Sequence, residues 1–213
     1  MGSIISALIA VIVLIFSAIC HEVAHGYVAE RLGDPTARLM GRLTLNPIKH
    51  IDPIMSIFLP LLLILSGSPV IFGAAKPVPI DPFNLKDGRK DIALVSAAGP
   101  LTNILIAIIA SVILKILIPF ANNGILQILA SFILIVVQIN LLLAIFNLIP
   151  IPPLDGSKIF SLILPEQTAV VYLSLGSVGF LILFFLLIFP IAGFSLGQFV
   201  FNLLMVAQRL LGV

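Results

Sequence analysis

Long, nearly uninterrupted runs of apolar residues constrain this chain more than any other feature of its sequence. Runs long enough to cross about 30 Å of hydrocarbon occupy residues 3–27, 92–118, 125–149, 168–189 and 194–210. Hydrophobic residues fill 61% of the 213 positions and charged residues only 9%, which excludes an ordinary soluble domain. We therefore expect an all-α polytopic membrane protein with about five to six transmembrane helices.

A cluster of ionisable residues stands at the end of the first apolar run. The sequence His21-Glu22-Val23-Ala24-His25 places two imidazoles four residues apart on one helix face, with a carboxylate beside them. Such a pair can bind one zinc ion, and the carboxylate can then act as general base toward water. The alternative is a set of satisfied polar groups in a helix bundle, but ionisable residues at membrane depth are costly and usually functional. His21 and His25 are therefore candidate metal ligands, and Glu22 is the candidate general base.

Asp155 is the candidate third ligand. It follows the proline-rich stretch 150–153, which must unwind the end of the third run, and it precedes Gly156. The carboxylate of Asp155 therefore projects from non-helical backbone, at the same membrane depth as the rest of the candidate site. An Asp-Gly turn at a helix exit is the alternative interpretation of the same residues.

Other polar residues have weaker claims on the site. Glu30 lies roughly 140° round the helix from the second histidine, and His50 and Asp52 stand in a proline-flanked segment where a surface role is the default. Asn147 lies on the helix that leads to the candidate aspartate and can donate to a developing oxyanion. Asn103 lies three residues after a Gly-Pro pair, and its amide can donate a hydrogen bond that holds the substrate. A helix–helix hydrogen bond is an equally good interpretation of either asparagine.

The positions of these residues decide the path of a sixth apolar stretch, residues 54–75. Prolines and glycines interrupt it, so its unbroken part is too short for a comfortable span. The candidate ligands lie near the exits of the first and third runs, so a shared site requires both exits on one side of the membrane. The second run crosses once between them. Residues 54–75 must then cross twice or not at all, and we expect a re-entrant segment.

The basic residues support this topology independently. In it, the segments 28–53, 76–91 and 155–167 and the C-terminal end lie on one side, and they hold ten of the eleven lysines and arginines. Lys115 is the exception. By the positive-inside rule, the candidate site faces the cytoplasm and the N-terminus lies outside.

The chain carries five successive motifs within residues 21–156: HEVAHGYVAERLGD, GRLTLNPIKHIDP, FGAAKPVPIDP, AAGPLTN and NLIPIPPLDG. Together they resemble the signatures of the site-2 protease family, and the compact prokaryotic members without a PDZ domain most of all. The resemblance implies an intramembrane zinc metalloprotease that cleaves single-pass transmembrane substrates in regulated intramembrane proteolysis. It implies one Zn²⁺ per chain, with Glu22 as base and His21, His25 and Asp155 as ligands, in the inner membrane of a prokaryotic cell.

We expect one membrane-embedded metalloprotease domain over residues 1–213, with a catalytic core at roughly 1–160 and additional helices at 168–210. The proline-rich stretch 150–153 and a strand-like, membrane-associated region at 40–48 are expected to offer backbone to an extended substrate.

Two other functions compete with this interpretation. A metal-ion transporter would use the same ligands but has no need of Glu22 beside them. An inactive scaffold would tolerate the loss of any one of the three ligands or of Glu22. The net charge of +2 is too small to indicate a nucleic-acid partner.

Overall fold

The structure is a computed structural model that describes residues 2–52, 58, 62, 76–121, 124–191 and 193–213. This part of the chain is helical, as expected, and it contains no β-strand. Its α-helices are α1 (Gly2–Leu32), α2 (Thr36–Leu39), α4 (Arg89–Leu117), α5 (Ile125–Asn147), α6 (Asp155–Phe160), α7 (Glu166–Ser174), α8 (Gly176–Ile188) and α9 (Leu196–Leu211). The 3-10 helices are η1 (Pro47–His50), η3 (Pro82–Asn84), η4 (Ile118–Phe120) and η5 (Ser161–Ile163).

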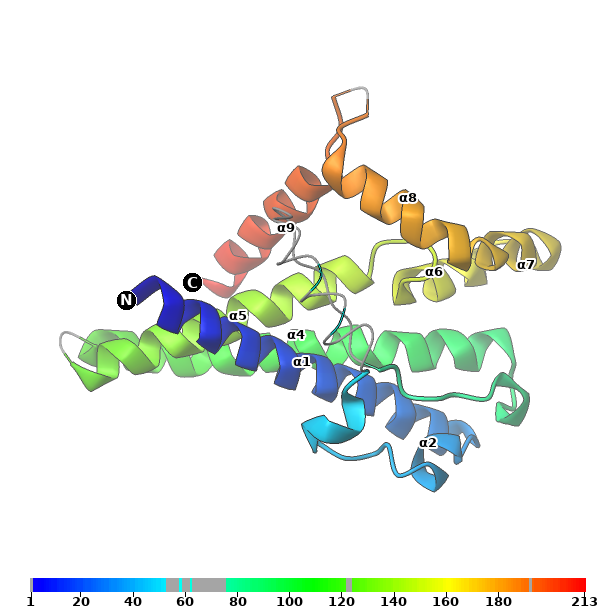
Figure 1. Cartoon of the computed structure of the whole chain (residues 1–213), viewed down its shortest axis with the longest axis horizontal. Coiled ribbons are helices and arrows are strands. Elements are labelled where there is room, and N and C mark those ends of the chain that lie inside the picture. The colour runs from blue at the N-terminus through cyan, green and yellow to red at the C-terminus, as the bar shows by residue number, and fades with distance from the viewer. Residues whose placement is uncertain (1, 53–57, 59–61, 63–75, 122–123, 192) are drawn as a thin grey trace.

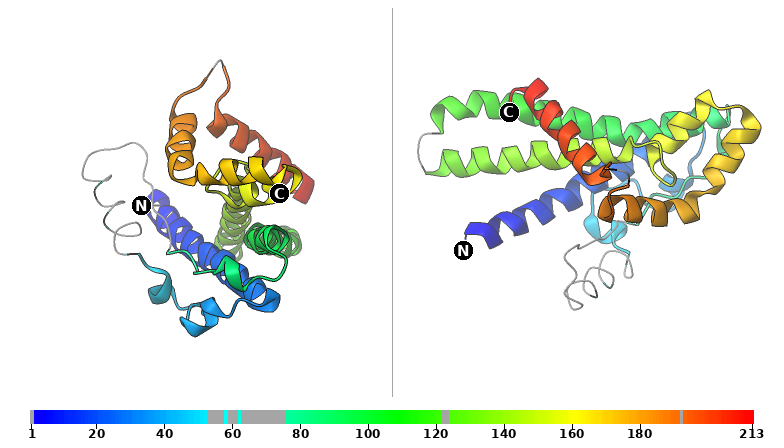
Figure 2. Two further views of the ribbon diagram at one scale, coloured as in Figure 1. Left: turned by 90° about the vertical axis from the view of Figure 1, so that its right-hand side faces the viewer. Right: turned by 90° about the horizontal axis from the view of Figure 1, so that it is seen from above.

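Three long apolar helices, α1, α4 and α5, form the body of the molecule and are long enough to cross a membrane. In Figure 1, α1 and α5 run in the same direction and α4 runs back between them, and Figure 2 shows the three side by side. The exits of α1 and α5 therefore lie at the same end of the bundle. This is the arrangement that a site shared by the first and third runs requires.

Small and β-branched residues allow α4 and α5 to pack closely. Their buried core consists of Ala107, Ala110, Leu114, Ile133, Val137 and Leu141. Lipid is as apolar as these side chains, so close backbone approach and van der Waals contact, rather than hydrophobic burial, hold such helices together.

In the part of the C-terminal third that the structure describes, no long, straight helix occupies either of the expected spans 168–189 and 194–210. The fourth run is divided into α7 and α8, which meet at a bend of 69°, and α9 has only 16 residues. The described residues thus hold three candidate spans, or four if the bent pair counts as one. The absence of a side chain at Gly179 lets α8 approach the proline-rich stretch closely, because a Cβ there would lie 1.9 Å from the carbonyl oxygen of Pro152. Helix α8 packs directly on the proline-rich stretch.

The C-terminal end lies on the other side of the bundle from where the sequence argument placed it. A Cβ on Gly212 would lie 2.8 Å from Nζ of Lys115, at the far end of α4, and Leu204 and Leu211 pack on the core shared by α4 and α5. Figure 1 shows α8 and α9 leading together from one end of the bundle to the other. Arg209 therefore lies at the same end of the bundle as Lys115. The other nine of the eleven basic residues lie at the end where α1 and α5 exit.

Two features are expected in the connection between α1 and α4, a re-entrant segment and a strand-like region. The expected re-entrant segment, 54–75, lies outside the described residues apart from positions 58 and 62. The expected strand-like region 40–48 consists of turns, bends and the start of η1.

Asp34 links the loop after α1 to the stretch before α4 by hydrogen bonds. Its carboxylate is fully buried and accepts hydrogen bonds from the backbone N–H of Asp81 at 2.7 Å and from the side-chain amide of Asn84 at 3.0 Å. Burial opposes ionisation, but the hydrogen bonds from Thr36, Asn84 and Asp81 hold the pKa of the Asp34 carboxyl below its ordinary value. The backbone of residues 76–81 is thereby held beside the end of α1.

Candidate metal centre

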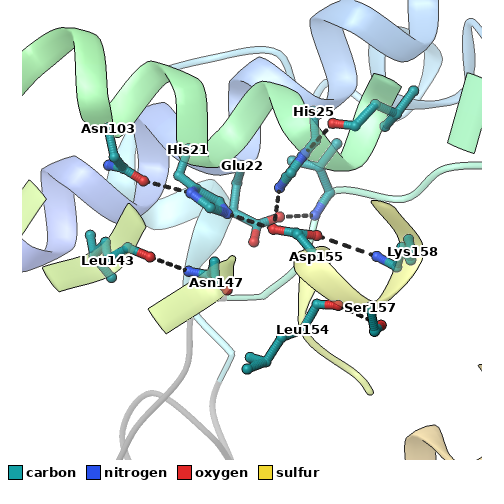
Figure 3. Close-up of polar contacts among 12 residues, drawn as sticks. His21, Glu22, His25, Asn103, Leu143, Asn147, Leu154, Asp155, Ser157 and Lys158 are labelled. Atoms are coloured by element: carbon teal, nitrogen blue, oxygen red, sulfur yellow. Dashed lines mark hydrogen bonds and ion pairs between the residues drawn. The ribbon is translucent and has the colours of Figure 1, made fainter. Parts of the chain in front are cut away.

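Three predicted ligands converge in the structure. Nε2 of His21 and Nε2 of His25, both on α1, lie 3.1 Å and 3.2 Å from Oδ2 of Asp155, the first residue of α6. One ligand atom from each residue lies within 4.8 Å of the others, and all three residues are buried. Figure 3 shows both imidazoles directed at the carboxylate. The structure thus joins positions 134 residues apart in the sequence.

Each histidine is oriented by a partner on α4. Nδ1 of His25 donates to the carbonyl oxygen of Val95 at 2.7 Å, and a carbonyl can only accept. Nδ1 of His21 lies 2.6 Å from Oδ1 of Asn103, whose amide nitrogen donates to Oδ1 of Asn140 at 2.8 Å. Both protons are thus directed to Nδ1, and both Nε2 lone pairs are left for a metal ion. Such partners are typical of histidines that bind zinc.

The donor set fits a zinc ion. Two ligands about 2.1 Å from zinc at a tetrahedral angle are about 3.4 Å apart, close to the two separations between imidazole nitrogen and carboxylate oxygen. Gly99 on α4 borders the same space, because a Cβ there would lie 2.5 Å from Nε2 of both histidines. Two neutral imidazoles and one carboxylate are a common protein contribution to a catalytic zinc site, which keeps one position open.

Local sequence explains how Asp155 reaches the histidines. Helix α5 ends at Asn147, and the prolines that follow turn the chain back on itself. Gly156 permits this return, because a Cβ there would lie 2.2 Å from the carbonyl oxygen of Leu148. Nζ of Lys158 lies 3.4 Å from Oδ1 of Asp155, whereas Oδ2 is the oxygen that lies near the two imidazoles.

Glu22 lies beside the ligands at a cavity of about 220 Å³. Its Oε2 accepts a hydrogen bond of 2.8 Å from the backbone N–H of Val78. The two histidines, Asp155 and Asn147 also line this cavity. The arrangement therefore places a carboxylate, three candidate metal donors and open space together, as hydrolysis by an activated water requires.

The two predicted asparagines lie in different places. Asn103 is fully buried, and Figure 3 shows it on one side of His21 with Asp155 on the other. Asn147 lines the cavity, and its amide donates to the carbonyl oxygen of Leu143 on its own helix at 3.0 Å. An oxyanion or substrate role for either asparagine stays a prediction.

The weaker ligand candidates are engaged elsewhere. Glu30 pairs with Arg38, and Nε2 of His50 lies 2.8 Å from the carbonyl oxygen of Thr44. Neither residue is in the ligand cluster found among the described residues. Sequence reasoning missed the two backbone groups that support the site, the carbonyl of Val95 and the N–H of Val78, because main-chain groups have no residue-type signature.

Comparison with known proteins gives a consistent result. The model of peptidase family M50 matches residues 9–120 and 116–190. YwhC of Bacillus subtilis, assigned as a zinc metalloprotease, is 38% identical over 87% of this chain and 83% of its own length. Rip2 of Mycobacterium tuberculosis has the same assignment and is 32% identical over 64% of this chain and 49% of its own length. No solved structure matches the chain.

Proposed function

The chain belongs to peptidase family M50, the site-2 protease family, and we propose that His21, His25 and Asp155 bind its catalytic zinc ion while Glu22 acts as general base. The protein is an intramembrane zinc metalloprotease. One observation carries the residue assignment: ligand atoms from α1 and α6 lie within 4.8 Å of one another, with Glu22 at the adjoining cavity.

The residues divide the chemistry between them. A zinc ion bound by the three ligands supplies Lewis acidity, which polarises the scissile carbonyl and makes a water molecule more acidic. Glu22 accepts the proton of the attacking water as the new C–O bond forms, and it delivers that proton to the leaving amine as the C–N bond breaks. Asn103 and the carbonyl of Val95 keep the Nδ1 proton of each histidine in place throughout.

The substrates of an integral membrane protease of this family are membrane proteins, and we assign single-pass transmembrane segments as the class. Such a segment must unwind before its carbonyl can reach the site. The stretch 150–153 has no free N–H to pair with it, because three of its residues are prolines and the N–H of Ile151 donates to the carbonyl oxygen of Ile149 at 2.8 Å. A substrate that pairs with this stretch must therefore donate its own N–H groups to the carbonyl oxygens of the stretch.

The charge distribution supports a cytoplasmic site in the inner membrane of a prokaryote. Nine of the eleven basic residues lie at the end of the bundle that holds the candidate site. Short basic loops remain cytoplasmic in most membrane proteins. Water reaches a site at this depth by a short path.

Metal analysis combined with a cleavage assay tests the proposal. The purified protein should contain about one zinc per chain, as a single set of three ligands and one open position requires, and cleave some members of a panel of single-pass membrane substrates. Glu22→Gln should keep the zinc but lower cleavage by a factor of about 10² or more, because an amide cannot accept the proton of water. Loss of zinc in this variant would make Glu22 a structural group, and retained cleavage would remove it as the base.

A further inference from the structure

The carboxylate of Glu22 is supported separately from the metal ligands. The ligands depend on α4 and on Lys158, whereas Oε2 of Glu22 accepts its hydrogen bond from Val78, in the connection that precedes α4. Glu22 lines the same cavity as the three candidate ligands, and Figure 3 labels it among them. The orientation of the base can therefore be changed without changing the donors to the metal.

Val78 is a specific donor within its segment. Pro77 and Pro79 flank it and have no N–H, so the N–H of Val78 is the one main-chain donor in this tripeptide. Proline also fixes its own φ and restricts the residue before it to extended conformations. The segment therefore presents a single N–H from a stiff, extended backbone, and that N–H is directed at Glu22.

Contacts at both ends hold this segment in place. Nη2 of Arg42, a buried guanidinium, donates to the carbonyl oxygens of Lys76 at 2.7 Å and Pro77 at 3.2 Å. The N–H of Lys76 donates to the carbonyl oxygen of His50 at 2.8 Å. At the other end, Asp34 accepts from the N–H of Asp81. The N–H of Val78 lies between these two anchors.

Gly26 allows the segment to approach α1. It stands one helical turn after Glu22, on the same face of the helix. A Cβ at this position would lie 2.7 Å from Cγ1 of Val78 and 2.7 Å from Cδ2 of Leu43. The absence of a side chain therefore lets Val78, which is itself buried, reach the helix that carries the base.

We propose that the backbone N–H of Val78 is a positioning group for Glu22, and that Arg42 is the side chain that holds it there. The inference rests on the proposed role of Glu22 as general base. A hydrogen bond to an ionised carboxylate is stronger than a neutral one and fixes the geometry of its acceptor. With Oε2 fixed, Oε1 is the oxygen that exchanges the proton with water and the leaving amine.

Replacement of Val78 by two different residues isolates the N–H. Val78→Ala removes most of the side chain but keeps the donor, whereas Val78→Pro removes the donor as well. The assay uses the full chain in proteoliposomes and a quenched-fluorescent peptide with a leucine-rich core of about 20 residues interrupted by Asn-Pro. We expect Val78→Pro to have a kcat about tenfold to a hundredfold below that of Val78→Ala. KM and zinc content should agree within about twofold, because neither depends on this N–H.

Three results would overturn the positioning role. Equal kcat in the two variants would show that the N–H is not used, a rise in KM alone would make the segment a substrate-binding element, and loss of zinc in Val78→Pro alone would make it a structural support. Glu22→Gln is measured in parallel. Cleavage retained in that variant refutes the proposed role of Glu22 as the base, whereas its loss there with equal Val78 variants refutes only the positioning role.

A second pair of variants decides the question if Val78→Pro does not fold. Arg42→Ala removes the donor to the carbonyls of Lys76 and Pro77, whereas Arg42→Lys keeps one. We expect a kcat about tenfold lower for Arg42→Ala than for Arg42→Lys, with equal zinc content. Equal kcat values, or zinc loss in every variant of both pairs, would contradict a role confined to Glu22.

Discussion

Gly99→Ala is expected to remove the metal without unfolding the protein. The new Cβ would lie 2.5 Å from Nε2 of both histidines, whereas ordinary contact begins at 3.4 Å. Each ring would have to retreat by about 0.9 Å, while zinc sites tolerate errors of about 0.2 Å in ligand distance. We therefore expect zinc affinity to fall by at least about a hundredfold, and cleavage to fall with it. Alanine is a better helix former than glycine, so helix α4 itself gains up to about 1 kcal/mol.

Gly197→Ala is the matched control for this variant. It makes the same change within helix α9, where the nearest atom to the new Cβ would be 3.8 Å away, in ordinary contact. Zinc content is measured by mass spectrometry after dialysis against a graded series of chelator concentrations, and folding is followed by circular dichroism and thermal unfolding. Full zinc occupancy and normal cleavage in Gly99→Ala would refute the position of Gly99 against the two imidazoles.

Three further results are expected. Asn103→Ala should weaken zinc binding by about tenfold to a hundredfold, because Nδ1 of His21 loses its acceptor; unchanged affinity in chelator competition would remove Asn103 as a support. In a variant without Cys20, cysteines at 86–90 should label only from the cytoplasm and a C-terminal tag only from outside; external labelling at 86–90 would reverse the proposed orientation. The lowered pKa of Asp34 stabilises the fold above the unfolded value of about 4, and this stability is lost as pH falls through the folded pKa. Asp34→Asn should therefore show a smaller loss of thermal stability than the wild type between pH 7 and pH 3, and equal losses would contradict this.

The sequence was sufficient to predict that the side chains of His21, His25 and Asp155 come together, but not that Asn103 contacts His21. The spacing of His21 and His25 predicts one helix face, and the basic segments and the position of Asp155 predict parallel α1 and α5. Both predictions agree with the structure. These features follow from helical periodicity and from the cost of charge in a bilayer, which act locally on known residue types.

The remaining features depend on tertiary contacts that residue types do not reveal. Val95 and Val78 support the site through main-chain atoms, and any residue other than proline could supply the N–H. The expected number of full spans is not confirmed in the last third of the chain, because apolar length does not distinguish a crossing helix from one that packs on an irregular stretch. Helix α8 packs in this way, because Gly179 lies against the carbonyl of Pro152.

Zinc content in Asp155→Asn and His50→Ala bears most directly on the site itself. Asparagine keeps the shape of Asp155 but removes the negative charge that helps to hold a dication, so zinc occupancy should fall sharply while the protein still folds. His50 contacts the carbonyl of Thr44 and lies outside the ligand cluster, so His50→Ala should keep its zinc and its activity. Full zinc in Asp155→Asn together with loss of zinc in His50→Ala would make His50 the third ligand and contradict the convergence of α1 and α6 on one metal ion.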